Sequence, residues 1–244
     1  MVASVMGTSP FAICAYCKRR GVVPYSRHMP KIVDHAERRS EIVVALWSTI
    51  YAEGISGVSF AAVARHGGIS IGRIQHYFAT KRDLVLAGVR AIVAAAEEDF
   101  RSTPEGSEIP GDEPARSSRA TPIDEGDATD HAVDTLRSLL TGQIPETQEA
   151  RIGSAVWSAY LAASMADREI AAVVHDALGG TRELIAQLVA QIRPDLAHAE
   201  VGTLALRLSA LRDGLAHEVL HGTAAPESAR AVIESEIAAL TSRG

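Results

Sequence analysis

The segment from Ser59 to Leu84 constrains the fold more than any other, because it divides itself into two short helices around a tight turn. Apolar residues after Ser59 recur at helical spacing, and Ser59 itself is suited to cap the helix start. Gly67 and Gly68 stand where a chain leaving a helix needs a positive φ, and Ser70 can cap a second helix at once. Two helices joined so closely must cross steeply. The pattern predicts a helix-turn-helix.

The second helix of this motif has one inward and one outward face. Ile74 and Phe78 lie four residues apart and can anchor it inward, whereas the polar residues between them cannot fill a core together. The segment 80–83 reads T-K-R-D, a capping box that opens a longer amphipathic helix. Upstream, one apolar stripe ends before Gly54 and consists of Val43, Leu46, Trp47 and Ile50. Together these elements predict a helical head of roughly seventy residues.

These residues resemble the TetR family of transcriptional regulators over about residues 38–93. The most specific part is G-I-S-I-G-R-I-Q-H-Y-F-A-T-K-R-D-L, from Gly68 to Leu84, which is most similar to the BetI-like branch; residues 211–222 also resemble the BetI-like C-terminal domain. Gln75 departs from the family, many members of which have a phosphate-contacting tyrosine there. The resemblance implies an all-α protein with a three-helix helix-turn-helix DNA-binding head and a helical ligand-binding and dimerisation domain.

Position and side-chain chemistry suggest DNA-contacting roles for nine residues of the head. Arg73 can read guanine and Gln75 can bond to adenine through two hydrogen bonds. The expected base-reading residues are Ile71, Gly72, Arg73, Gln75 and His76, and the expected phosphate contacts are Ser59, Ser70, Tyr77 and Lys81. Each serine would also cap a helix in any helical protein, and His76 could equally be a solvated surface residue.

The net charge of −6 would not favour DNA binding if it were spread evenly, but it is divided along the chain. Residues 1–30 carry +4, residues 31–90 carry +3 and residues 91–244 carry −13. The positive charge therefore accompanies the motif, while an acidic body would help to orient the head toward DNA.

Composition predicts four regions: a disordered extension (1–30), the DNA-binding domain (31–99), a flexible loop (100–127) containing four prolines, and a helical ligand-binding and dimerisation domain (128–244). The extension holds Cys14 and Cys17, which could be half of a zinc site or a redox pair, although translation starting at Met29 would exclude both. The first thirty residues contain neither a membrane-length apolar span nor a secretory signal pattern, so we expect a cytoplasmic protein without a membrane partner.

The body is expected to contain helices over 130–141, 145–167, 168–193, 197–221 and 226–242, with a weak point at Gly179 and Gly180. In the resembled family the terminal helices form a four-helix dimer interface. The residues expected there are Leu204, Leu208, Leu211, Leu215, Val219, Val232, Ile233, Ile237 and Leu240. Packing within one chain is the alternative, and one helix can serve both purposes.

A small-molecule effector of unknown identity is expected to bind between the body helices, in an apolar pocket with a few polar groups. The candidate lining residues are Trp157, Tyr160, Met165, His175 and His217. Each could instead be a core or surface residue. Because aromatic residues are few here, an aliphatic or mixed ligand is favoured over one held in an aromatic cage.

The sequence thus predicts a homodimeric, ligand-responsive repressor that binds a pseudo-palindromic DNA operator. The alternative is a helical small-molecule-binding or adaptor protein without operator binding. We expect no enzymatic activity, cofactor or metal, since the chain has no Gly-rich phosphate loop and no HExxH or G-x-S-x-G motif.

Overall fold

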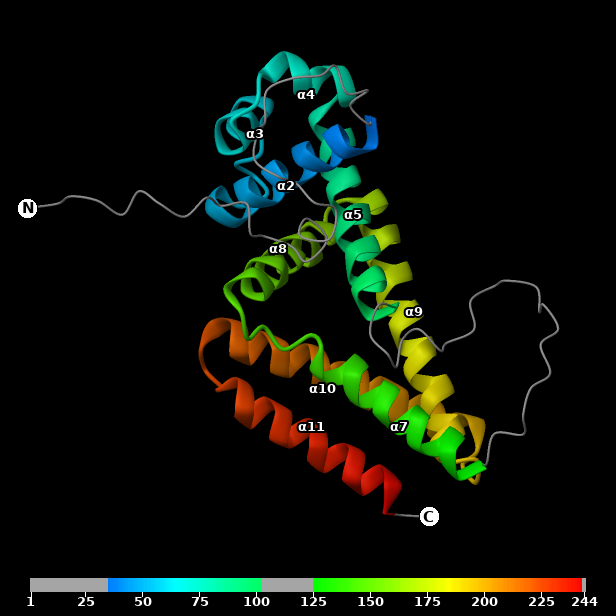
Figure 1. Ribbon diagram of the computed structural model, residues 1–244. Coiled ribbons are helices and arrows are strands. Elements are labelled where there is room, and N and C mark those ends of the chain that lie inside the picture. The colour runs from blue at the N-terminus through cyan, green and yellow to red at the C-terminus, as the bar shows by residue number, and fades with distance from the viewer. Residues whose placement is uncertain (1–34, 102–124, 243–244) are drawn as a thin grey trace, which may run out of the picture. The chain divides into compact units, whose positions relative to one another are not determined.

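The computed structural model describes residues 35–101 and 125–242. Within these two ranges the chain forms nine helices and no strand, which confirms the predicted all-α class (Figure 1). The helices are α2 (His35–Glu53), α3 (Phe60–Gly67), α4 (Ile71–Tyr77), α5 (Lys81–Arg101), α7 (Glu125–Thr141), α8 (Gln148–Ser164), α9 (Arg168–Ile192), α10 (His198–His221) and α11 (Pro226–Thr241).

The described residues divide into two compact units. The first unit contains 35–92 and 148–171, and the second contains 93–101, 125–147 and 172–242. Helices α5 and α9 contribute residues to both units. Helix α8 belongs to the first unit because it packs on α2, and the predicted functional domains (31–99 and 128–244) stay a prediction.

The first unit is built around α2, on which α3 and α8 pack, while α4 packs on α3 (Figure 1). The predicted stripe on α2 is buried, and α2 ends before Gly54, which has a φ of 72°. Ile74 and Phe78 are fully buried, as their spacing predicted. Burial of these large apolar side chains, each worth about 1.5–3 kcal/mol, fixes the orientation of the short helix that carries them.

Local hydrogen bonds set the helix boundaries of the head. The Ser59 hydroxyl accepts from the N–H of Ala62 at 3.1 Å, and the Ser70 hydroxyl accepts from the N–H of Arg73 at 3.2 Å. At the start of α5, Thr80 and Asp83 form the reciprocal capping box, with both bonds 3.0 Å long. These three predicted caps are confirmed.

The turn between α3 and α4 uses one left-handed residue, not two. Gly68 has a φ of 61°, whereas Gly67 ends α3 and has no positive φ, so the prediction for Gly67 is wrong. A Cβ on Gly67 would lie 2.5 Å from the Cβ of Ala45 on α2. Gly67 is therefore required for close packing of α3 against α2 and not for the turn itself.

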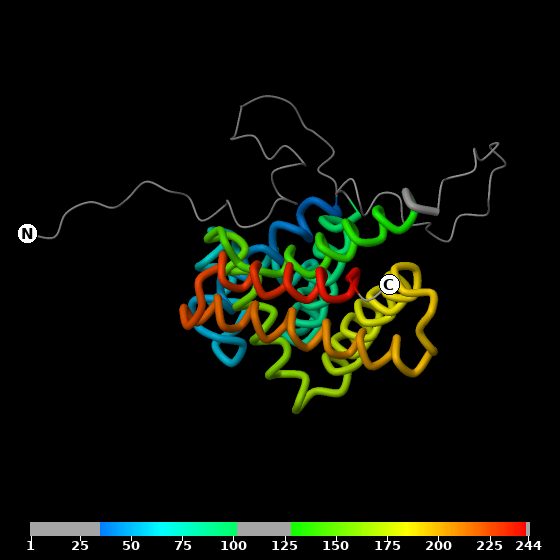
Figure 2. Tube along the Cα trace, turned by 90° about the horizontal axis from the view of Figure 1, so that it is seen from below, coloured from blue at the N-terminus to red at the C-terminus, as the bar shows by residue number. Residues whose placement is uncertain are grey.

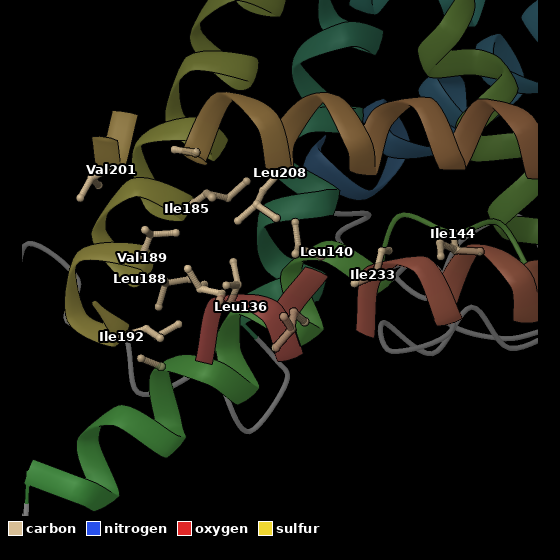
Figure 3. Packing of buried hydrophobic residues seen from close by; sticks show 14 of the residues in the cluster. Leu136, Leu140, Ile144, Ile185, Leu188, Val189, Ile192, Val201, Leu208 and Ile233 are labelled. Carbon is tan, nitrogen blue, oxygen red and sulfur yellow. The ribbon is translucent and has the colours of Figure 1, made fainter. Parts of the chain in front are cut away.

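The second unit packs α7, α10 and α11 side by side, with α10 and α11 antiparallel (Figure 2). Helix α9 supplies Ile185, Leu188, Val189 and Ile192 to the same core, facing residues of α7, α10 and α11 (Figure 3). Ion pairs of Arg137 with Glu234 and of Arg230 with Glu146 hold α11 to α7 and to the segment after it.

The body helices begin and end close to the predicted positions, with three differences. Helix α7 starts at Glu125, inside the predicted loop, and α5 runs through Arg101 at the loop's other end. Helix α8 begins at Gln148 and ends at Ser164, so it is three residues shorter at each end than predicted. Helix α9 continues through Gly179 and Gly180 without a break, although a helical glycine costs about 1 kcal/mol, and the weak point expected there stays a prediction.

The predicted N-terminal extension, with Cys14, Cys17 and Met29, lies outside the described residues, as does the loop over 102–124. Across the described ranges, no helix combines the length and apolar character needed to cross a membrane. In the same part of the chain, no three His, Cys, Asp or Glu side chains gather as a metal site.

Candidate nucleic-acid interface

Helix α4 is held to the head by two buried side chains and exposes the residues between and before them, which form an outward row. Ile74 is completely buried beneath it, and Phe78 closes its C-terminal end. The five residues predicted to read bases are all exposed, namely Ile71, Gly72, Arg73, Gln75 and His76. Ile71 is unusual among them because a large apolar side chain is left 43% exposed. This row can therefore meet a surface outside the protein.

The structure would accommodate a side chain at Gly72. A Cβ placed on it would meet nothing within 4 Å, and its backbone is helical. A glycine in a short helix costs stability, and at this outward position it leaves the helix backbone open to close approach.

Charged side chains of helix α2 contact α4 and the residue that ends it. Arg39 donates to the carbonyl oxygen of Tyr77 at 3.4 Å, and its guanidinium lies 4.3 Å from the centre of the Phe78 ring. Glu41 accepts two bonds of 2.9 Å from Arg38 and lies 4.0 Å from the Arg73 guanidinium. Positive charge therefore supports the C-terminal end of α4, and a carboxylate lies behind its central arginine.

The residues predicted to contact phosphate surround this row. Ser59, Ser70 and Lys81 are exposed at the starts of α3, α4 and α5, and Tyr77 is half-buried at the end of α4. The Tyr77 ring lies 4.4 Å from that of His35 and 5.1 Å from that of His76, measured between ring centres. His35 is a residue that the sequence did not single out; its only signal was its place at the start of the first helix.

Arg82, the neighbour of Lys81, is held inside the first unit. Its guanidinium binds Asp167 at 2.5 Å and Glu169 at 2.9 Å, and Asp167 also accepts from the N–H of Ile170 at the start of α9. The first turn of α5 is thereby connected to the first turn of α9. Among neighbouring basic residues of the head, Lys81 is thus suited to bind DNA and Arg82 to link two helices.

The pKa of Asp167 is lowered, first by the hydrogen bond from the Ile170 N–H and also by Arg82. A lowered carboxyl pKa stabilises the fold above the ordinary value of about 3.9 and ceases to do so as the pH falls through the folded pKa. We expect Asp167→Asn to destabilise the protein at pH 7 and to lose this difference from wild type as the pH falls below about 4. Urea unfolding at pH 7 and pH 3 measures it; an unchanged difference would contradict the assignment.

The five candidate ligand-contacting residues are divided between the two units. In the first, Tyr160 is fully buried and donates to the Val85 carbonyl at 3.3 Å, Trp157 is half-buried, and Met165 is 91% exposed. In the second, His175 is exposed and the half-buried His217 bonds to the Asp213 carbonyl at 2.7 Å. None of the five lines the groove between α10 and α11 that is described below. A ligand-contacting role for them stays a prediction.

Most residues predicted for the dimer interface lie in the core of the second unit. Leu208, Val219, Ile233, Ile237 and Leu240 are buried there, and Leu204 and Leu215 pack against them. Leu211 is half-buried, and Val232 alone among the nine is exposed, at 42%. Packing within one chain, the alternative weighed from the sequence, accounts for most of this apolar pattern.

A surface of α10 that contains no Asp, Glu, Lys or Arg was not singled out from the sequence. Opposite its buried face, the helix presents a row without a single charge over more than five turns, comprising Ala199, Thr203, Leu206, Ala210, Gly214, His217 and His221. Leu206 is 53% exposed at its middle. A solvated helix face normally carries charges, so this uncharged α10 face has the composition of an interface. The sequence-based prediction of the dimer interface relied instead on the periodic leucines of the neighbouring face of α10.

A groove of about 470 Å³ separates the first half of α10 from the second half of α11. Three predicted interface residues, Leu204, Leu208 and Leu240, form part of its wall. Arg207 and Glu236 bind each other across it at 2.6 Å. The groove and the uncharged α10 face together leave apolar area on the outside of the second unit.

Comparison with known proteins gives consistent matches to both parts of the chain. A family model described as "Bacterial regulatory proteins, tetR family" matches residues 42–87, and one described as "BetI-type transcriptional repressor, C-terminal" matches residues 132–242. The regulator PksA of Bacillus subtilis is 27% identical over 191 residues, covering 77% of this chain and 81% of PksA. BetI of Stenotrophomonas maltophilia is 27% identical over 187 residues, covering 77% of this chain and 83% of BetI.

Solved structures share the fold. A transcriptional regulator from Saccharomonospora viridis, in complex with choline, has a TM-score of 0.67 and 24% identity, covering 83% of this chain and 96% of that protein. A TetR-family regulator from Rhodococcus sp. has a TM-score of 0.66 and 22% identity, covering 84% and 99%. The likeness extends over nearly the whole of each neighbour and so includes both the head and the body helices.

Proposed function

Because this chain belongs to the TetR family of transcriptional regulators, we propose that it is a homodimeric repressor that a small molecule releases from its operator. The family consists of regulators and not of enzymes, as the sequence predicted. The observation that carries the proposal is the outward row on α4, anchored by the buried Ile74 and Phe78. Such a regulator would act where the DNA is, in the cytoplasm.

The outward row supplies chemistry suited to the major groove of DNA. The guanidinium of Arg73 can donate to O6 and N7 of guanine, and the amide of Gln75 can pair with adenine. Ile71 offers apolar contact to a thymine methyl group, and Gly72 allows the helix to come close. A single good bidentate contact discriminates against a wrong base by about 1–3 kcal/mol.

The contacts around the row would fix the docking of the head. Lys81 at the start of α5, with Ser59, Ser70 and Tyr77, can bind phosphates on either side of the groove. These contacts carry no sequence information, so we assign them to affinity and register and not to base selection.

Selection of bound sequences from a random duplex pool tests the function. We expect the wild type to enrich one inverted repeat at near-physiological salt, with half-sites about 34–36 Å apart or a near multiple of that spacing. The Arg73→Ala/Lys81→Ala variant should stay folded and enrich none, because it loses a base contact and a phosphate contact. If the folded wild type enriches no sequence at any salt concentration, the protein is better described as a helical ligand-binding or adaptor protein.

A homodimer would be formed by the uncharged α10 face and the adjoining surface of α11. The outward side of α11 carries a row of small residues with Val232 at its edge, namely Ser228, Ala231, Ser235 and Ala238. Small side chains let helices approach closely, and Leu206 and Val232 supply apolar area to bury. A two-fold axis through this surface would pair two heads, as a pseudo-palindromic operator requires.

Effector release is supported by the helices that the two units share. The choline bound to the Saccharomonospora viridis neighbour indicates that this fold can hold a small molecule. A ligand that favours one arrangement of α5 or α9 would act on the first turn of α5 through Arg82 and Asp167. By linkage, the factor by which the ligand weakens operator binding equals the factor by which the operator weakens ligand binding.

A further inference from the structure

Helix α2 contributes one carboxylate to the outward row of α4. Glu41 lies on α2, where both of its oxygens accept from the Nη1 of Arg38 at 2.9 Å, and its Oε2 lies 4.0 Å from the Nη1 of Arg73. The side chains of Glu41 and Arg38 are each about one-third exposed, and that of Arg73 is 44% exposed. The cluster therefore stands at the edge of the surface that faces DNA.

The Glu41 carboxylate interacts differently with its two arginines, because it lies 2.9 Å from Arg38 and 4.0 Å from Arg73. Arg38 takes the short hydrogen bonds, and this pairing with Glu41 raises the pKa of Arg38. Arg73 feels the negative charge without being hydrogen-bonded to it, since 4.0 Å exceeds hydrogen-bonding distance. Its donors therefore stay available to a base edge while the charge behind restrains the side chain.

Such a restraint matters because arginine is long and flexible. An unrestrained Arg73 could reach a phosphate as readily as a base, and ordering an arginine side chain costs rotamer entropy. The Glu41 carboxylate attracts the guanidinium and so limits the positions that it adopts, which lowers this entropic cost and disfavours a reach toward a distant phosphate. A contact to phosphate adds affinity for any sequence, whereas a contact to a base adds specificity.

We propose that Glu41 is a positioning residue that sets base specificity by directing Arg73. This inference rests on the proposed operator binding and adds a residue from α2, outside the recognition helix, to the specificity of the site. The neighbouring Arg39 acts differently, because it binds the Tyr77 carbonyl and the Phe78 ring and so supports the helix as a whole.

The test compares base preference at every operator position for the wild type, Glu41→Gln, Arg73→Ala and the double variant. Arg73→Ala first identifies the base that Arg73 reads. At that position we expect Glu41→Gln to reduce discrimination about three- to fivefold, the upper part of what an exposed ion pair contributes, and to leave the other positions unchanged. In the Arg73→Ala background the same change should have no further effect there.

Glu37→Gln is the matched control, since it removes the same charge from the exposed first turn of the same helix. It should leave the base preferences unchanged. Equal weakening at all positions by Glu41→Gln would indicate a purely structural role and would overturn the inference, as would unchanged discrimination at the Arg73 position or the absence of such a position. Failure of the wild type to select any operator would instead overturn the proposed function, and the inference with it.

Discussion

Replacing Gly88 by alanine is expected to lower the urea midpoint of unfolding of the first unit strongly. A Cβ at this position would lie 2.5 Å from Cδ2 of Leu46 and closer still to the hydroxyl of Tyr160, well inside the 3.0 Å that real Cβ contacts keep. The Gly88 carbonyl also accepts from the indole N–H of Trp47 at 3.2 Å. Overpacking of a rigid core costs about 1–3 kcal/mol, so the added methyl group is strongly destabilising.

Gly153→Ala is the matched control, in the same unit and also within a helix. A Cβ on Gly153 meets nothing within 4 Å, so the alanine should stabilise α8 by about 0.5–1 kcal/mol. Both tryptophans, Trp47 and Trp157, belong to the first unit, and their fluorescence reports its unfolding in urea. Equal effects of the two replacements would show that the contacts at Gly88 do not limit the packing.

The contrast between these glycines shows which features the sequence could predict. The caps at Ser59, Ser70 and Thr80 were predictable because a cap depends on residues within three positions of itself. Ile74 and Phe78 were predictable because one helical face has a fixed spacing. Both kinds of feature depend only on residues that are close together in the sequence.

Features that depend on distant neighbours could not be predicted. Gly88 lies on the apolar face of its helix, but nothing near it in the sequence indicates that Tyr160 fills the space above it. Gly67 was assigned to the turn because the approach of Ala45 is a tertiary contact. Glu41 likewise belongs to the DNA-facing surface only because α2 passes behind α4. The sequence predicted the recognition helix itself and missed the residues that support it.

Leu206→Glu is expected to dissociate the proposed homodimer while leaving the chain folded. Leu206 lies at the middle of the uncharged α10 face and is 53% exposed, so the substitution disturbs no buried core within one chain. In a two-fold interface each substitution occurs twice, which would bury two unpaired carboxylates. We expect the dimer Kd to rise at least about a hundredfold, since each tenfold step requires only about 1.4 kcal/mol. Analytical ultracentrifugation measures it.

Ala190→Glu provides the control, because it adds the same charge to an exposed position of α9 in the same unit. It should leave the dimer Kd unchanged, and both variants should keep the wild-type far-ultraviolet circular dichroism. Operator affinity should fall together with dimerisation in Leu206→Glu, since a single head makes only half of the contacts to an inverted repeat. If Leu206→Glu remains a dimer with wild-type affinity, the uncharged α10 face is not the subunit interface. The groove between α10 and α11 then becomes the surface to test next, beginning with substitutions of Arg207 and Glu236 at its rim.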